Sequence, residues 1–271
     1  MSYISLSIGD ETYRADSEAV CDLSIAVNFN EPQLQAYGAP PARAQALHTG
    51  EFIGAVLQNG SCNCATYSLT PHCNGTHTES VAHLTQDLLS INTLARHGLM
   101  LASLVTVDPI SVNVHGSNPD QVLTLDSLKD CLKNQLNYPI PQALTALIVR
   151  TTPNQTDKTI RNYDQGSNPA YFEPAALRWL AEIGIEHLLV DLPSVDRMDD
   201  GGALLAHRAF WGLPVGDKQL RHASRPHATI TELIYVPDSL LDGLYLLNLQ
   251  IAPFLADAAP SRPLVYPVLP P

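Results

Sequence analysis

The chain has 271 residues, 45% of them hydrophobic, which is enough for a substantial core and fits one large domain over residues 1–271. Its formal net charge of -12 argues against nucleic-acid binding, which requires clustered lysine and arginine, and no run of basic residues occurs. The first fifteen residues lack the apolar run of a secretory signal, and the longest apolar stretch, 244–256, is too short for a bilayer. We therefore expect a cytoplasmic protein with five reduced cysteines and no membrane partner.

The N-terminal part of the chain predicts strands, a loop and one helix. Alternating polar and apolar residues over 3–14 indicate a hairpin around Gly9-Asp10. Further short strands are expected at 21–28, 50–57 and 65–69. Residues 31–45 are rich in Pro, Ala and Gln and indicate a loop that could cover a site. Apolar residues at 84, 88, 91 and 94 have helical spacing and predict a helix over 84–97, ended by Gly98.

The remaining sequence predicts mixed strands and helices. Strands are expected at 99–107, 143–150, 187–190, 229–236 and 244–251. Helices are expected at 125–136, 173–183 and 203–211. Five prolines between 260 and 271 predict an extended tail docked on the surface or on a partner subunit. Because strands and helices mix without strict alternation, the predicted fold class is α/β, one domain with a mixed, strongly curved sheet flanked by helices.

A polar window at residues 72–83 concentrates candidate metal ligands. If it is extended, Cys73, Gly75, His77 and Glu79 point to one side, because successive side chains of a strand alternate faces. The glycine leaves space for a cation between the thiol and the imidazole. A thiolate, an imidazole and a carboxylate on one face predict an open zinc site with room for water.

His83 follows Glu79 by four residues, close enough to reach that water. We therefore interpret His83 as the catalytic acid or base that acts on a zinc-bound hydroxide. A histidine that only closes a turn is the structural alternative for His83.

Two further observations bear on metal binding. Glu232 lies inside an apolar run, 230–236, where an unpaired carboxylate is costly, so it favours a ligand or a buried ion pair. Cys62-x-Cys64 together with His72 and Cys73 could instead form a closed structural zinc site, although the one-residue gap is tighter than usual.

Three motifs resemble one family. The segment Cys73-Asn74-Gly75-Thr76-His77-Thr78-Glu79, followed by His83, resembles the His-x-Gly-Thr-His-x-Asp-x-x-x-His signature of the cyclase family, which includes bacterial kynurenine formamidase and isatin hydrolase. Similar family segments are a Gly-x-Asp-x-Pro-Ser-x-Asp loop at 189–196, its preceding helix at 172–185, and a second ligand pair at Ala206-His207 and 230–233. Asp191 and Asp196 in that loop are expected to accept backbone hydrogen bonds. The resemblance covers about residues 20–268.

The resemblance implies a metal-dependent hydrolase with a small barrel-like core, assembled as a homodimer or larger homo-oligomer. It implies a first metal held by Cys73, His77 and Glu79, with Glu79 bridging to a second metal held by His207 and Glu232. His83 would be the acid or base. One or two Zn²⁺ ions are expected, with Mn²⁺ as the alternative.

This chain departs from the family pattern in two ligands. Cys73 stands where the family has histidine, and Glu79 stands where it has aspartate. A thiolate favours Zn²⁺ over Mn²⁺ and weakens its Lewis acidity. A local change of register would let His72 supply the first ligand instead. The segment 214–226 also resembles an insertion.

The leading interpretation is a hydrolase of a small amide, lactam or ester, such as an arylformamide of tryptophan catabolism or a cyclic amide. The alternatives are a family member that binds metal and a small ligand without hydrolysis, a cyclase or dehydratase, and a metal-free interaction module. Trp211, with Tyr37 or Phe210, is expected to line the substrate pocket.

Overall fold

The computed structural model describes residues 2–30, 32–95, 98–113, 119–136, 143–166 and 168–269. Its strands are β1 (Tyr3–Ile8), β2 (Glu11–Asp16), β3 (Cys21–Asp22), β4 (Arg43–Ala46), β5 (His48–Thr49), β6 (Phe52–Ile53), β7 (Ala65–Ser68), β8 (His77–Glu79), β9 (Met100–Val107), β10 (Ile110–Val112), β11 (Asp120–Leu123), β12 (Leu144–Thr151), β13 (Tyr171–Phe172), β14 (His187–Val190), β15 (Thr229–Glu232), β16 (Gly243–Ile251) and β17 (Ala258–Pro267). Its helices are α1 (Pro71–Asn74), α2 (Leu125–Leu136), α3 (Pro174–Glu182) and α4 (Leu205–Trp211). Short 3-10 turns are η1 (Val56–Gln58), η2 (Val81–His83), η3 (Ile91–Thr93), η4 (Thr156–Thr159) and η5 (Leu220–His222).

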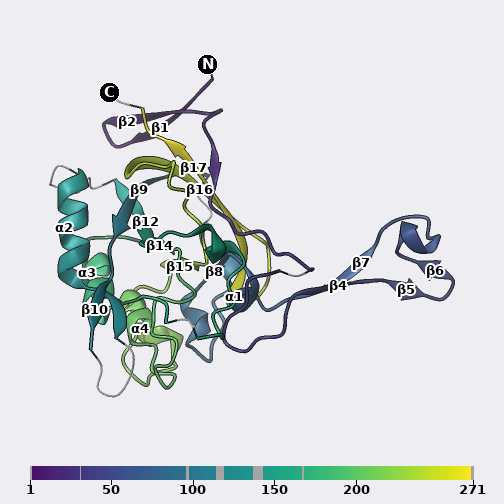
Figure 1. Cartoon of the computed structure of the whole chain (residues 1–271). Helices are drawn as coiled ribbons and strands as arrows, with labels where there is room; N and C mark the ends of the chain where they lie inside the picture. Colours follow the sequence, from purple (N-terminus) through teal and green to yellow (C-terminus); the bar gives the residue numbers. More distant parts are fainter. Residues whose placement is uncertain are drawn as a thin grey trace.

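The main sheet closes into a barrel. Its order is β16-β9-β12-β14-β15-β8-β17, and β17 pairs back with β16 to complete the ring (Figure 1). The joins from β9 through β12 and β14 to β15 are parallel, and the other joins are antiparallel. β3 pairs with Leu264 and Val265, near the C-terminal end of β17. The expected mixed, curved α/β sheet is confirmed.

Apolar side chains fill both faces of this sheet. The helix-facing cluster joins alternate residues of β9 and β12 to α2, α3 and α4, which lie together on one side of the barrel (Figure 1). The complementary residues of the same strands form a second cluster in the barrel interior. Burial on both faces explains why β9 and β12 are nearly continuous apolar runs rather than alternating ones.

The predicted helix over 84–97 is wrong. The described part of this segment has only a short 3-10 turn, η3, after η2. Thr85 donates to the carbonyl of Asp87 at 2.8 Å, and Thr93 donates to the carbonyl of Ser90 at 2.7 Å. Such local hydrogen bonds compete with a helix, which explains why the apolar spacing misled the prediction. His97 lies outside the described residues.

The proline-rich C-terminus is extended, as predicted, but it is not a docked tail. It forms β17, which pairs with β8, β16 and β3 and closes the barrel. The prolines are tolerated because their carbonyls still accept: Pro260 accepts from Ala252 at 2.9 Å, and Pro263 accepts from Leu23 at 3.0 Å. Residues 270 and 271 lie outside the described part.

A long arm projects from the barrel. β4 pairs with β7, and β5, β6 and η1 lie beyond them, away from all the helices that cover the sheet (Figure 1). Several apolar side chains of the arm are exposed, including Leu57, Val56 and Phe52. Among the described residues, no helix combines the length and the hydrophobicity required to cross a bilayer.

Candidate metal centre

The polar window folds into a turn of helix, a strand and a 3-10 turn rather than one extended segment. The prediction that residues 73–79 are extended is therefore wrong in its first half. Pro71 begins α1, and the carbonyl of Thr70 accepts from the amides of Cys73 and Asn74 at 2.9 and 3.1 Å. Proline favours the first turn of a helix because its fixed φ suits it and its missing N–H is not needed there. Only β8 is a strand here.

A buried Gly-Thr turn connects α1 to β8. A Cβ on Gly75 would lie 2.8 Å from Cγ2 of Val27, so a larger residue requires that side chain to move. The hydroxyl of Thr76 accepts from the amide of Ile25 at 2.7 Å and donates to the carbonyl of Leu233. Thr76 therefore joins three segments distant in sequence directly beside β8.

Replacing Thr76 with valine is expected to destabilise the fold by about 2–3 kcal/mol, because the isosteric side chain leaves a buried N–H and a buried carbonyl without a partner. The free energy of unfolding in urea measures this loss. Thr66→Val, on the exposed face of β7, serves as the matched control. A loss for Thr76→Val no larger than that of the control would contradict the assigned role.

β8 lies between β15 and β17 and presents its charged residues to one side. His77 pairs opposite Glu232, and Glu79 pairs opposite Ile230. Because side chains alternate along strands, His77, Glu79 and Glu232 share a face. Ile230 belongs to the helix-facing cluster, so this face is directed toward the helices and not into the barrel.

Glu79 occupies the middle of the cluster and is fully buried. Its Oε1 lies 2.8 Å from Nε2 of His207. Its Oε2 lies 3.2 Å from Nδ1 of His72 and 3.9 Å from Nδ1 of His83. Burial raises the pKa of Glu79, but the charges of His83 and His207 outweigh it and hold the pKa well below the usual range. Glu79 is therefore a carboxylate surrounded by three imidazoles.

Glu232 is the second buried carboxylate. Its Oε2 lies 3.5 Å from Nε2 of His77, and its Oε1 lies 3.5 Å from Nε2 of His207. Oε1 also accepts from the amide of Val195 at 2.9 Å. Burial and the neighbouring Glu79 raise the pKa of Glu232, but the nearby imidazoles of His207 and His77 lower it overall.

Asp196 orients His207. Its Oδ2 lies 2.6 Å from Nδ1 of His207, and its carboxylate accepts from the amides of Ala206 and His207 at 2.7 and 3.1 Å. The predicted acceptance of backbone hydrogen bonds by Asp196 is confirmed, and it acts on the first turn of α4. Burial lowers the pKa of His207, yet the charge of Glu79 and the bond to Asp196 raise it well above its usual value. A carboxylate on one ring nitrogen leaves the other aimed at Glu79, the usual arrangement behind a metal-ligating histidine.

Among the described residues, three groups of side chains could hold metal, and the two more buried groups share Glu79. The ligand atoms within each group lie within 4.8 Å of one another: one group is His72, His77 and Glu79, the second is Glu79, His207 and Glu232, and the third, which is more exposed, is His72, His83 and Asp257. In the described part of the chain, Nε2 of His77 and Oε2 of Glu79 are buried without a hydrogen-bond partner. Buried polar atoms are rarely left unpaired, and an imidazole nitrogen and a carboxylate oxygen are good donors to zinc. The residues present therefore fit a divalent ion.

Cys73 lies outside these groups among the described residues, and His72 from the same turn of α1 lies inside them. Cys73 is buried and lines the adjacent cavity. Burial and the carboxylates of Asp164 and Glu232 raise the pKa of its thiol to about 11. Metal ligation by Cys73 stays a prediction. Cys62 and Cys64, both exposed on the arm, belong to none of the described groups, so no closed site with Cys73 is seen there.

A cavity of about 460 Å³ opens over the cluster. Its walls include Tyr37, as predicted, together with Met198 and Leu204. The prediction that Trp211 and Phe210 line the pocket is wrong, because both side chains are fully buried in the core. Instead, the Trp211 ring packs 5.4 Å from that of His207 and supports it from behind.

Asp257, just before β17, is a member of the centre that the sequence did not reveal. Its Oδ2 lies 3.0 Å from Nε2 of His72 and 3.5 Å from Nδ1 of His83. These contacts lower the pKa of Asp257. Burial lowers the pKa of His72, but Asp257 and Glu79 raise it to about 10. No motif marks Asp257; only the pairing of Ala258 with Glu79 brings it here.

Comparisons with known proteins agree with this architecture. A crystal structure of an isatin hydrolase bound to the product analogue thioisatinate superposes with a TM-score of 0.63 at 17% identity, covering 92% of each chain. Isatin hydrolase A from Labrenzia aggregata, bound to benzyl benzoate, gives 0.61 at 17% identity, covering 91% of this chain and 93% of the other. A predicted metal-dependent hydrolase from Bacillus stearothermophilus gives 0.57 at 14% identity, covering 91% and 97%.

These likenesses show the fold. No curated protein matches the chain. The family model described as "Putative cyclase" matches residues 21–197, more than half of the sequence, including the whole polar window and the Asp196 loop. With that match and a barrel of the same architecture, the chain belongs to the cyclase family.

Proposed function

We propose that this chain is a metal-dependent hydrolase of a small amide, lactam or ester. The observation that carries the proposal is the shared, fully buried Glu79, which has imidazole nitrogens beside both of its carboxylate oxygens. The proposed ligands are His72, His77 and Glu79 for one divalent ion, and Glu79, His207 and Glu232 for a second. His72 is preferred to Cys73 because its Nδ1 lies 3.2 Å from Glu79.

A divalent ion in this position would lower the pKa of a water molecule and polarise a carbonyl oxygen. The imidazole and carboxylate ligands suit Zn²⁺ and also Mn²⁺, and we propose zinc. The protein's own contribution is to hold these ligands rigidly. Asp196 fixes one ring nitrogen of His207, and Trp211 packs against the same ring.

His83 is proposed to move the proton between water and leaving group. Its side chain is partly exposed and lines the cavity beside both ligand groups. Its Nδ1 lies 3.5 Å from Asp257, which leaves the second ring nitrogen for substrate or water. A histidine changes its charge near neutral pH and is well suited to accept and then donate a proton.

The cavity supports a small substrate with an apolar part. Tyr37, Met198 and Leu204 supply apolar surface, and Ser194 supplies a hydroxyl. The nearby Arg197 is held by Asp120, with Nε at 2.7 Å from Oδ2, so its charge is already paired. The likeness to isatin hydrolases further supports a cyclic amide as the substrate class.

Metal analysis of the purified protein, joined to a hydrolysis screen on formamides, lactams and lactones, tests the proposal. Bound zinc at one or two equivalents and turnover of at least one substrate class are expected. Tight zinc without hydrolysis of any of them would favour a cyclase, a dehydratase or a ligand-binding role. Absence of bound metal from protein prepared without chelators would contradict the metal centre itself.

A homodimer or larger homo-oligomer is also proposed. The projecting arm carries exposed Leu57, Val56 and Phe52, and a monomer would leave this apolar surface in water. Sedimentation velocity is expected to show a mass of at least twice 29.4 kDa. Leu57→Asp is expected to weaken the assembly, and a wild-type protein that sediments as a monomer at micromolar concentration would refute it.

A further inference from the structure

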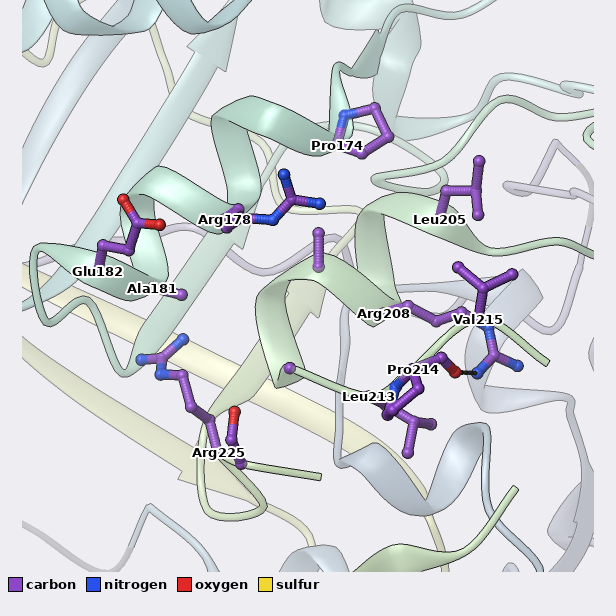
Figure 2. A pocket seen from close by; sticks show the side chains of 13 residues that line it. Pro174, Arg178, Ala181, Glu182, Leu205, Arg208, Leu213, Pro214, Val215 and Arg225 are labelled. Atoms are coloured by element: carbon purple, nitrogen blue, oxygen red, sulfur yellow. Dashed lines mark hydrogen bonds between the residues drawn. The ribbon is translucent and has the colours of Figure 1, made fainter. Parts of the chain in front are cut away.

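A second cavity, of about 640 Å³, is lined by α3, by α4 and by the segment after α4 (Figure 2). Leu205, Arg208 and Ala209 of α4, and Gly212 directly after it, line this cavity. These four residues have the spacing of one helix face, whereas His207 projects from the opposite face toward Glu79. The second cavity therefore does not share the walls of the metal centre, although both use the same helix.

The other walls come from α3 and from the segment after α4. Pro174, Arg178, Ala181 and Glu182 follow one face of α3. The remaining wall includes Leu213, Pro214, Val215, Ser224 and Arg225. Most of that wall belongs to the segment 214–226, which in the sequence resembles an insertion.

Three arginines and only one carboxylate are among the residues that line this cavity. Figure 2 shows Arg178 and Arg225 on the α3 side and Arg208 beside Pro214. Within the described residues, no carboxylate oxygen lies within 4.0 Å of any of the three guanidinium groups, although Glu182 also lines the cavity. The local excess of positive charge contrasts with the net charge of -12 of the whole chain.

Main-chain carbonyls satisfy part of this hydrogen-bonding capacity. Arg208 donates from Nε to Ala203 at 3.1 Å and from Nη1 to Pro214 and Asp217 at 2.8 Å each. Arg225 donates from Nη1 to Phe210 at 2.8 Å and from Nη2 to Ile185.

Nitrogens that could bind a ligand remain on each arginine. Nη2 of Arg208, Nε of Arg225 and the whole guanidinium of Arg178 have no hydrogen-bond partner within the described ranges, yet none is among the fully buried unpaired atoms. Carbonyl acceptors do not neutralise the charges: burial lowers the pKa of Arg225, and the charge of Glu186, which lies beyond 4.0 Å, opposes this only in part. Burying a cation is costly without an anion nearby, and Arg208 is 7% exposed.

We propose that this cavity binds a small organic carboxylate with an apolar body. Arginine pairs well with a carboxylate because its planar fork matches the two oxygens. The apolar part would contact Leu205, Leu213 and Val215, and the carboxylate would be held between the arginines. This inference does not depend on the proposed hydrolysis, since it uses a separate cavity.

Calorimetric titration of the full-length, metal-loaded protein with benzoate tests the proposal, and benzamide serves as the neutral isostere. Benzoate is expected to bind, and benzamide is not. Arg178→Gln is expected to weaken benzoate binding about two- to fivefold, the range for an exposed charge pair. Glu182→Gln removes the only carboxylate among the lining residues and is expected to strengthen binding by a similar factor. Both side chains are exposed, so folding should persist.

Arg43→Gln, on the exposed arm, is the charge-matched control and should bind benzoate as the wild type does. Equal benzoate affinity in Arg178→Gln and wild type would overturn the proposal, because binding would then occur elsewhere, including at the metal centre. Benzamide binding as tightly as benzoate would overturn the charge recognition. Inorganic sulfate binding as tightly as benzoate would overturn the need for an apolar body.

Discussion

Glu79→Gln is expected to lose bound metal and to lower turnover by more than about 100-fold. Loss of a residue that only supports a metal ligand costs up to about 100-fold, and loss of a ligand itself should cost more. The amide keeps the shape of the side chain but removes the charge that both proposed ligand groups share. Metal content by plasma mass spectrometry and steady-state kinetics measure the two effects. Glu51→Gln, an exposed glutamate on the arm, is the matched control.

Glu79→Asp tests whether the charge or the length of the side chain matters for metal binding. It keeps the carboxylate but shortens it by one methylene, so we expect it to retain metal better than Glu79→Gln. Full metal content and full activity in Glu79→Gln would exclude Glu79 as a ligand. The same result would also remove the bridging role, since the two groups have only this residue in common.

His83→Ala is expected to lower kcat by about 10²–10⁴-fold, which is the usual contribution of a general acid or base. The metal content is expected to stay unchanged. His83 belongs to neither of the two proposed ligand groups; it forms a separate, more exposed cluster with His72 and Asp257, and its nitrogen is 3.9 Å from Glu79. The ligand set therefore stays complete in the variant.

The matched control for His83→Ala is His222→Ala. His222 is an exposed histidine paired with Asp217 at 2.6 Å, away from the metal centre. It should keep both activity and metal. If His83→Ala turns over substrate at the wild-type rate, the proton-transfer role is wrong. If it loses metal together with activity, His83 acts as a ligand instead.

Local sequence patterns predicted most elements because short-range physics determines them. The 12 residues of α2 and the run of β9 followed directly from periodicity and from continuous hydrophobicity. The same reasoning failed over 84–97, where polar side chains bond nearby carbonyls and prevent the helix. Periodicity describes which face would be buried, but it does not count such competing local bonds.

The available chemistry can be read from the residue types alone: the polar window, the glutamate inside an apolar strand, and the family motifs around them. Which of these groups lie close together is seen only in the folded chain. Pairing of β17 with β8 brings Asp257 to His83, and the helical turn at Pro71 places His72, not Cys73, within reach of Glu79. Such contacts join residues far apart in the chain, and their distances depend on barrel closure and backbone direction, which no local pattern encodes.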